Sequence, residues 1–190
     1  MENSQVKNQT DWINAAFLIG TPLLTILFVI LYLKIDGFNP TILIPTLILY
    51  FITGISITAG YHRLFSHRSF KAHPIVKFVF LVFGAATFQN STLKWSTDHR
   101  RHHLECDTDE DPYSITKGFF HAHFGWLLIK EKEKYKDKFA PDLLNDPLVL
   151  LQHKFYLPLC IIVGFGLPIY LGYLMGSILG GIAIVALFRI

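Results

Sequence analysis

Two long apolar runs near the start of the chain most constrain its fold. The first covers residues 12–35 and the second covers residues 41–61. An α-helix rises about 1.5 Å per residue, so runs of this length can cross a hydrocarbon core of about 30 Å. The chain as a whole is 52% hydrophobic and only 16% charged. These features predict an all-α integral membrane protein.

The apolar runs are expected to form two helical hairpins. Residues 36–40 are rich in helix breakers and predict a short turn that makes the first two spans antiparallel. We expect a third span at 155–175, irregular because it contains prolines and glycines. A partial fourth span follows at 178–190, which is too short to cross the membrane. The chain, 1–190, is then a single domain whose fourth span is truncated.

A charged central region separates the hairpins. Residues 62–152 contain 13 of the 17 lysines and arginines, so the positive-inside rule makes this region cytosolic. Within it, residues 74–88 are apolar but too few for a span, and predict a buried or interfacial helix beside the hairpin. The aromatic residues 118–129 predict a second helix lying on the surface. Residues 130–138 alternate in charge, as in a solvated helix or linker.

Five of the nine histidines form two clusters at the edges of apolar runs. His99, His102 and His103 are related as i, i+3 and i+4, so a helix presents all three on one face. Neutral imidazole is a common ligand of iron, zinc and copper, so this face indicates a metal site. His62 and His67 lie about 140° apart on a regular α-helix. They converge only if the end of the second span unwinds, or if they flank a pair of metal ions.

Acidic residues stand on both sides of the second cluster. The carboxylate of Asp98 has two open roles, because it could orient a ligand imidazole through the ring's other N–H or could cap a helix N-terminus. The acidic residues that follow the cluster lie in a loop closed by proline, and their pattern predicts solvated side chains. These residues are Asp107, Asp109, Glu110 and Asp111.

The other histidines and the cysteines carry weaker signals. We interpret the four remaining histidines as loop, interfacial, structural or supporting residues: His73, His121, His123 and His153. Cys106 lies in a charged loop and Cys160 in an apolar run, so the two are unsuited to pair. Both are expected to be free thiols in a reducing compartment.

The ligand types narrow the choice of metal. A set rich in histidine and without cysteine ligands excludes a structural zinc finger and suits iron, copper or zinc. Because the site opens onto an apolar, membrane-embedded interior, oxidation of a lipid chain by O₂ at iron fits better than hydrolysis. The chain has no basic aromatic stripe and a net charge of only +3, so we expect no nucleic-acid partner.

Four stretches resemble the membrane-bound acyl-CoA desaturases of the Δ9, or stearoyl-CoA, type. Residues 60–70 read GYHRLFSHRSF and look like the first histidine box of that family. Residues 95–103 read WSTDHRRHH and look like the second box. Residues 107–114 resemble the loop that follows, and residues 118–128 resemble the segment after it. The residues around the histidine boxes distinguish this family from other histidine-box oxygenases, which share only the boxes.

The resemblance implies an O₂-dependent enzyme with two iron ions. It would take electrons from a carrier such as cytochrome b5 or ferredoxin and introduce a cis double bond into a fatty acyl-CoA. Gln89 and Trp95 match family residues that line the bend of the acyl tunnel, and a basic residue near Lys130 could meet a CoA phosphate. The metal site would face the cytoplasm from a bacterial inner membrane or the endoplasmic reticulum. By the match, the iron ligands are His62, His67, His99, His102 and His103.

The chain departs from the family in lacking a third histidine box of HxxHH type after its fourth span. We therefore expect a fragment of a longer desaturase that holds iron incompletely and does not turn over alone. Two alternatives stay open: another histidine-box oxygenase acting on acyl lipids, by desaturation or hydroxylation, and a non-catalytic truncated paralogue. Further coding sequence with an HxxHH motif favours the enzyme.

Overall fold

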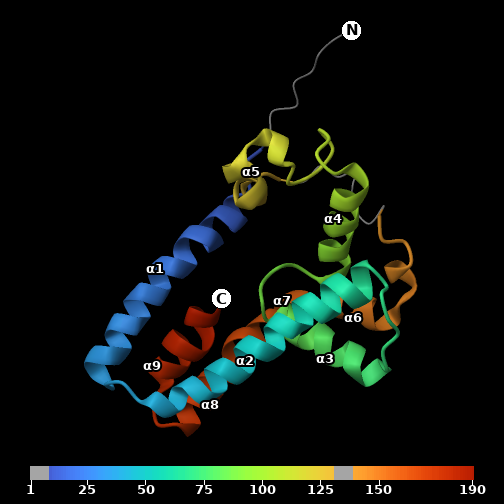
Figure 1. Ribbon diagram of the computed structural model, residues 1–190. Helices are drawn as coiled ribbons and strands as arrows, with labels where there is room; N and C mark the ends of the chain where they lie inside the picture. The colour runs from blue at the N-terminus through green and yellow to red at the C-terminus, as the bar shows by residue number, and fades with distance from the viewer. Residues whose placement is uncertain (1–8, 131–138) are drawn as a thin grey trace.

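The computed structural model describes residues 9–130 and 139–190, and these residues are built mainly from helices (Figure 1). The α-helices are α1 (Trp12–Ile35), α2 (Leu43–Ile55), α3 (Pro74–Ala85), α4 (Thr92–Glu105), α5 (Phe119–His123), α6 (Pro147–Lys154), α7 (Tyr156–Ile161), α8 (Leu167–Leu174) and α9 (Ile178–Gly180). Three segments are π-helical: η2 (Ser56–Ser66), η7 (Ile162–Gly166) and η8 (Gly181–Ala186). The 3-10 segments are η1 (Pro40–Ile42), η3 (Ile115–Lys117), η4 (Gly125–Leu128), η6 (Leu143–Asn145) and η9 (Leu187–Arg189).

Three helical stretches of the described residues are long and apolar enough to cross a membrane. Many of their large apolar side chains, such as Leu23, Ile48 and Leu157, are exposed on the outer surface of the protein. Lipid chains solvate such a surface, whereas water does not. The protein is therefore an all-α integral membrane protein, as its sequence predicts. The stretches are Trp12–Ile35, Pro40–Ser66 and Tyr156–Leu174.

The turn after α1 is fixed by side-chain hydrogen bonds. The backbone N–H of Asn39 donates to the Tyr32 hydroxyl over 2.8 Å, and the Asn39 side chain caps η1 by accepting from the Thr41 N–H. The Ser177 hydroxyl donates to the Asp36 carboxylate, which ties the turn to the start of α9. Helix α9 lies between α1 and α2 in Figure 1, and η8, which follows it, contacts both of these helices.

The helix of the second span continues five residues beyond the predicted end at Tyr61. Its last part, η2, winds as a π-helix, in which the N–H of residue i+5 bonds the carbonyl of residue i. The N–H of His67 donates to the carbonyl of His62 over 3.0 Å, and the Ser66 hydroxyl donates to the carbonyl of Tyr61 over 2.7 Å. These bonds let the helix run past the apolar stretch into the charged region.

Helix α3 packs against η2 and is three residues shorter than the predicted 74–88. It ends at Ala85, and soon afterwards Phe88 adopts a φ of 60°, which a right-handed helix excludes. Gly84 lets the buried ring of Tyr61 approach, since a Cβ on that glycine would lie 2.4 Å from the ring. The Tyr61 hydroxyl accepts a hydrogen bond from Gln152 over 2.8 Å. One core thus joins the second span to α3 and α6.

The aromatic stretch 118–129 is not the single surface helix that its sequence predicts. Gly118 has a φ of 99°, which starts a new segment, and the helix α5 stops after five residues. The 3-10 segment η4 follows, and the N–H of Asp11 bonds the carbonyl of Leu128 over 2.8 Å. This places η4 beside the first turn of α1. Of the predicted charged linker, residues 131–138 lie outside the described residues.

Helices α8 and η8 meet at two glycines. A Cβ added to Gly172 would lie 2.5 Å from the Cα of Gly181, and backbone atoms cannot move aside as a flexible side chain can. Membrane helices that contact each other so closely depend on small residues, because lipid offers no hydrophobic drive for association. The C-terminal hairpin is held together by this contact.

We expect Gly172→Ala to lower the stability of the protein by about 1–3 kcal/mol, since it overpacks a backbone contact. Gly20→Ala is the matched control, because a Cβ there meets nothing within 4 Å in α1. Thermal unfolding in detergent, followed by circular dichroism, compares the two variants. Equal unfolding midpoints in the two variants would contradict a close backbone contact between α8 and η8.

Candidate metal centre

Helix α4 carries the second histidine cluster and is well defined at its start. The Ser91 hydroxyl accepts a hydrogen bond from the Lys94 N–H over 3.3 Å, as an N-cap does. From this start the predicted i, i+4 relation holds, and His99 and His103 project from one face towards η2. The two ring centroids are 4.6 Å apart.

The π-helical winding of η2 brings the first cluster together. On a regular α-helix His62 and His67 would point about 140° apart. A π-helical turn closes over five residues, so it places both rings on the same side. The Nε2 atoms of His62 and His67 are 3.1 Å apart, and the ring centroids are 4.6 Å apart. The local unwinding that convergence requires is therefore present as a π-helix.

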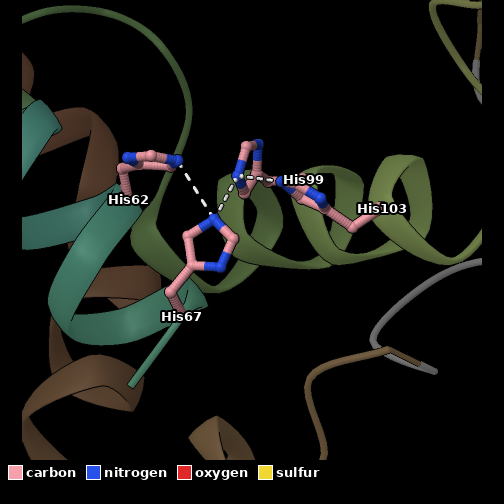
Figure 2. A group of neighbouring side chains, drawn as sticks. All are labelled: His62, His67, His99 and His103. Carbon is pink, nitrogen blue, oxygen red and sulfur yellow. Dashed lines mark hydrogen bonds between the residues drawn. The ribbon is translucent and has the colours of Figure 1, made fainter. Parts of the chain in front are cut away.

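Four imidazoles from the two elements converge on one point (Figure 2). The Nε2 of His67 is 3.0 Å from the Nε2 of His99, which is in turn 3.1 Å from the Nε2 of His103. One ligand atom from each of His62, His67, His99 and His103 lies within 4.8 Å of all the others. We call these four residues the histidine cluster.

The spacing within the histidine cluster fits a bound metal ion. Two nitrogens that each lie about 2.1 Å from one ion and subtend a right angle are about 3.0 Å apart. The observed Nε2 separations of 3.0–3.1 Å match this value. The donors are all imidazole nitrogens, which suit iron, copper or zinc rather than calcium or magnesium.

The electrostatics of the cluster favour neutral rings. Burial, reinforced by the neighbouring histidines, lowers the pKa of His99 to about 3. The pKa of His67 is lowered for the same reasons, burial first and then the charge of His62. A ring that stays unprotonated at neutral pH keeps its lone pair free for a cation. His99 and His67 are thus ready to bind a metal without first losing a proton.

The fifth predicted ligand, His102, lies beside the cluster rather than in it. Its ring centroid is 5.6 Å from that of His103, and its Nδ1 is 3.0 Å from both carboxylate oxygens of Asp111. It belongs to a second group of possible metal-binding side chains, with Cys106 and Asp111. Its assignment as a ligand stays a prediction.

Asp107, Asp109 and Glu110 are exposed, as the sequence predicts, whereas Asp98 and Asp111 are buried. The alternative role of Asp98 as a helix cap is wrong, because Ser91 caps α4. Asp98 accepts two hydrogen bonds from Lys94, over 2.7 and 2.8 Å, and its predicted contact with a ligand imidazole stays untested. The prediction that Asp111 is solvated is wrong, since its side chain is fully buried against His102. The only signal in the sequence was an aspartate followed by proline, nine residues after a histidine.

Arg100 holds the two histidine-bearing elements together. Its guanidinium donates to the carbonyls of Phe65 and Ser66, over 2.7 and 2.9 Å, at the end of η2. The same group makes a two-pronged ion pair with Asp142. The hydrogen bond from Arg100 lowers the pKa of the Asp142 carboxyl below its usual range. One residue of α4 thereby fixes the position of the η2 terminus that carries His67.

An apolar cavity of about 480 Å³ opens beside the cluster. Trp95 and His99 both line it, and their rings stack with centroids 4.9 Å apart. Gln89, the other predicted tunnel residue, also lines the cavity, together with Phe17 and Phe88. The structure thus brings Gln89, Trp95 and the cluster to one place.

A second, polar cavity of about 430 Å³ adjoins the first. The two share Asn14, Asn90, Asp98, Trp126 and Leu127 in their walls. The polar cavity adds both basic and acidic side chains, with Lys94, Arg101, Lys117 and Lys130 providing the positive charge. A molecule with a charged head and an apolar chain could occupy both.

The four histidines outside these two groups make other contacts. His73 caps α3 by accepting the Ile75 N–H, and His121 lies 3.2 Å from the carbonyl of Pro112. His123 stacks on Phe119. The exposed ring of His153 lies 2.7 Å from the Ser91 hydroxyl at the start of α4, and its predicted interfacial position stays a prediction. These are structural contacts.

A model of the fatty acid desaturase family matches residues 38–190 of the chain. The match includes both histidine clusters, the acidic loop and the C-terminal hairpin. The chain therefore belongs to the fatty acid desaturase family, and the resemblance seen in its histidine boxes is confirmed.

Curated relatives are acyl-CoA desaturases. A probable acyl-CoA desaturase of Schizosaccharomyces pombe is 37% identical over 173 residues, which cover 90% of this chain and 35% of the relative. The Delta(9)-fatty-acid desaturase fat-6 of Caenorhabditis elegans is 43% identical over 127 residues, covering 65% and 38%. Acyl-CoA desaturase 1 of Saccharomyces cerevisiae is 32% identical over 185 residues, covering 95% and 35%. The chain spans little more than a third of the length of these relatives.

We expect Arg100→Lys to weaken metal binding by about tenfold, because an ammonium cannot reproduce the fork that bonds two carbonyls and a carboxylate. Arg63→Lys, at an exposed position of η2, is the control. Competition with a chelator gives the metal affinity of each purified variant. An unchanged affinity in Arg100→Lys would mean that the η2 terminus holds its position without this brace.

Proposed function

We propose that the protein acts as an O₂-dependent acyl-CoA desaturase that introduces a cis double bond into a saturated acyl chain. The observation that carries this proposal is the opening of an apolar cavity directly against His99, at the point where four imidazole nitrogens meet. A site that binds metal at one end of an acyl-sized apolar cavity suits oxidation of a hydrocarbon chain.

The metal we propose is iron, with His62, His67, His99, His102 and His103 as protein ligands to two ions. Iron bound there would supply the activation of O₂, which takes two electrons and two protons and, with two hydrogens from the chain, yields two waters. Five imidazoles do not fill the coordination of two ions, so we place the remaining ligands outside the described residues or in solvent. The all-nitrogen donor set of the histidine cluster supports this assignment.

The residues that line the apolar cavity would determine which carbon atoms of the acyl chain react. A saturated chain offers no polar group at those carbons, so only the shape of the cavity can set its position. Trp95 stacks on His99 and makes an edge contact with His62, with centroids 6.2 Å apart. Its indole is therefore a wall that holds the chain at a set distance from the metal. Gln89 would shape the bend and exclude water.

The polar cavity would take the head of the substrate. Lysine and arginine bind phosphates, and Lys94, Arg101, Lys117 and Lys130 line this cavity, where carboxylates such as Asp98, the partner of Lys94, stand beside them. Because it shares a wall with the apolar cavity, a thioester between the head and the chain would lie where the two join. The names of the relatives support CoA as the head group.

We further propose that the metal site faces the cytoplasm from a bacterial inner membrane or the endoplasmic reticulum. The excess of lysine and arginine in residues 62–152 supports this orientation. An electron carrier of the cytochrome b5 or ferredoxin type would then reach the site from the cytoplasm.

The test is product analysis in a desaturase-deficient host that expresses the protein from its complete coding sequence. We expect a cis-monounsaturated acyl product detected by mass spectrometry. His99→Ala should abolish this product and lower bound iron, whereas His123→Ala, at an exposed ring outside the cluster, should retain both. Trp95→Ala should shift the double-bond position or the preferred chain length.

Two outcomes would contradict the proposal. An iron-loaded protein that gives only hydroxylated acyl chains would assign it to the related oxygenases. A His99→Ala variant with full desaturation and normal iron would refute the ligand assignment.

A further inference from the structure

The carboxylate of Asp111 is buried and fully committed to hydrogen bonds. Its exposed fraction is 0%, and one oxygen accepts the N–H of Asp107 over 3.0 Å while the other accepts the N–H of Tyr113 over 3.1 Å. Both oxygens lie 3.0 Å from Nδ1 of His102. The loop thus presents a carboxylate acceptor to one histidine.

The loop that carries Asp111 is itself fastened. Asp107 has a φ of 60°, which turns the chain back after α4. The ammonium of Lys117 donates to the carbonyls of Asp109 and Asp111, over 2.8 and 3.0 Å. The carboxylate is therefore held by backbone on both sides, and its position does not depend on His102.

The chemistry of this contact decides the tautomer of His102. An ionised carboxylate only accepts hydrogen bonds, so Nδ1 of the neutral ring must carry the proton. The lone pair is then on Nε2, the atom on the other side of the ring. Tyr113 stacks on the same ring, with centroids 4.2 Å apart at 29°. The carboxylate fixes the rotation of the ring, and the stacked phenol fixes its plane.

We propose that Asp111 is a positioning residue that presents the Nε2 of His102 to the metal centre. This inference rests on the proposed function, in which His102 is a ligand. A carboxylate behind a ligand imidazole raises the basicity of the ring and fixes its direction, and removal of such a partner weakens metal binding by 10–100-fold in other proteins. Tyr113 adds a similar contact to His99, since its hydroxyl lies 3.4 Å from Nδ1 of that ring.

The test compares Asp111→Asn with Asp109→Asn, which makes the same chemical change at an exposed position of the same loop. Asparagine has a single acceptor oxygen for three donors, so it cannot hold both backbone N–H groups and His102. We expect Asp111→Asn to bind iron about 10–100-fold more weakly and Asp109→Asn to bind it normally. Iron affinity is measured on purified protein by chelator competition, with metal content by mass spectrometry.

A double-mutant cycle with His102→Ala separates positioning from a purely structural role. If Asp111 acts through His102, Asp111→Asn has no further effect on iron affinity once His102 is alanine. Asp111→Glu keeps the charged acceptor and should restore part of the affinity. If Asp111→Asn fails to fold, the partial recovery in Asp111→Glu is the deciding result, judged by helix content and iron affinity together.

Several outcomes would overturn the inference. Wild-type iron affinity in Asp111→Asn would do so, as would an equal loss in the His102→Ala background. Cys106 lies near both His102 and Asp111, and these three could hold a separate cation. If Cys106→Ser loses as much iron as Asp111→Asn does, the three side chains bind a separate cation and Asp111 does not act as a positioning residue. Failure of the wild type to bind iron would refute the proposed function as well. The outcomes above, obtained with a wild type that binds iron, would refute the inference alone.

Discussion

The histidine cluster depends on one change in helical winding. The bond from the N–H of His67 to the carbonyl of His62 spans five residues, so the two rings lie on one side of the second span. With regular α-helical winding they would diverge, and η2 would present at most one ring to α4. π-Helical turns are rare, and they frequently occur at functional sites. Here the π-helical winding brings together His62 and His67, two of the four rings of the histidine cluster.

The second requirement is that η2 and α4 keep a fixed distance. Arg100 bonds two carbonyls at the end of η2, and Tyr61 and Gln152 join the same span to α6 through a buried hydrogen bond. Both interactions use charged or polar side chains, and both act on the η2 end of the second span. The spans themselves are held by apolar and glycine contacts. The polar network therefore positions the metal ligands, and the hairpins position the network relative to the membrane.

The sequence predicted the parts that follow from local periodicity and composition. The spans were evident because side chains that face lipid must be apolar, and the relation of His99 to His103 followed from the α-helical repeat. The sequence left open whether His62 and His67 converge by unwinding or flank a metal pair, because a hydrogen bond between residues i and i+5 leaves no mark in the hydrophobic pattern. The burial of Asp111 was also missed, since four acids within five residues resemble a solvated loop. Gln89 and Trp95 were found only through the family resemblance.

The decisive measurement is X-ray absorption at the iron edge, on protein expressed from its complete coding sequence and purified with its metal. We expect bound iron with a first shell of nitrogen and oxygen at about 2.1 Å, strong outer-shell scattering from imidazole, and no sulfur. A sulfur shell at about 2.3 Å would instead place Cys106 on the metal. That result, or a protein that retains no iron, would contradict the assignment of the histidine cluster as an iron site.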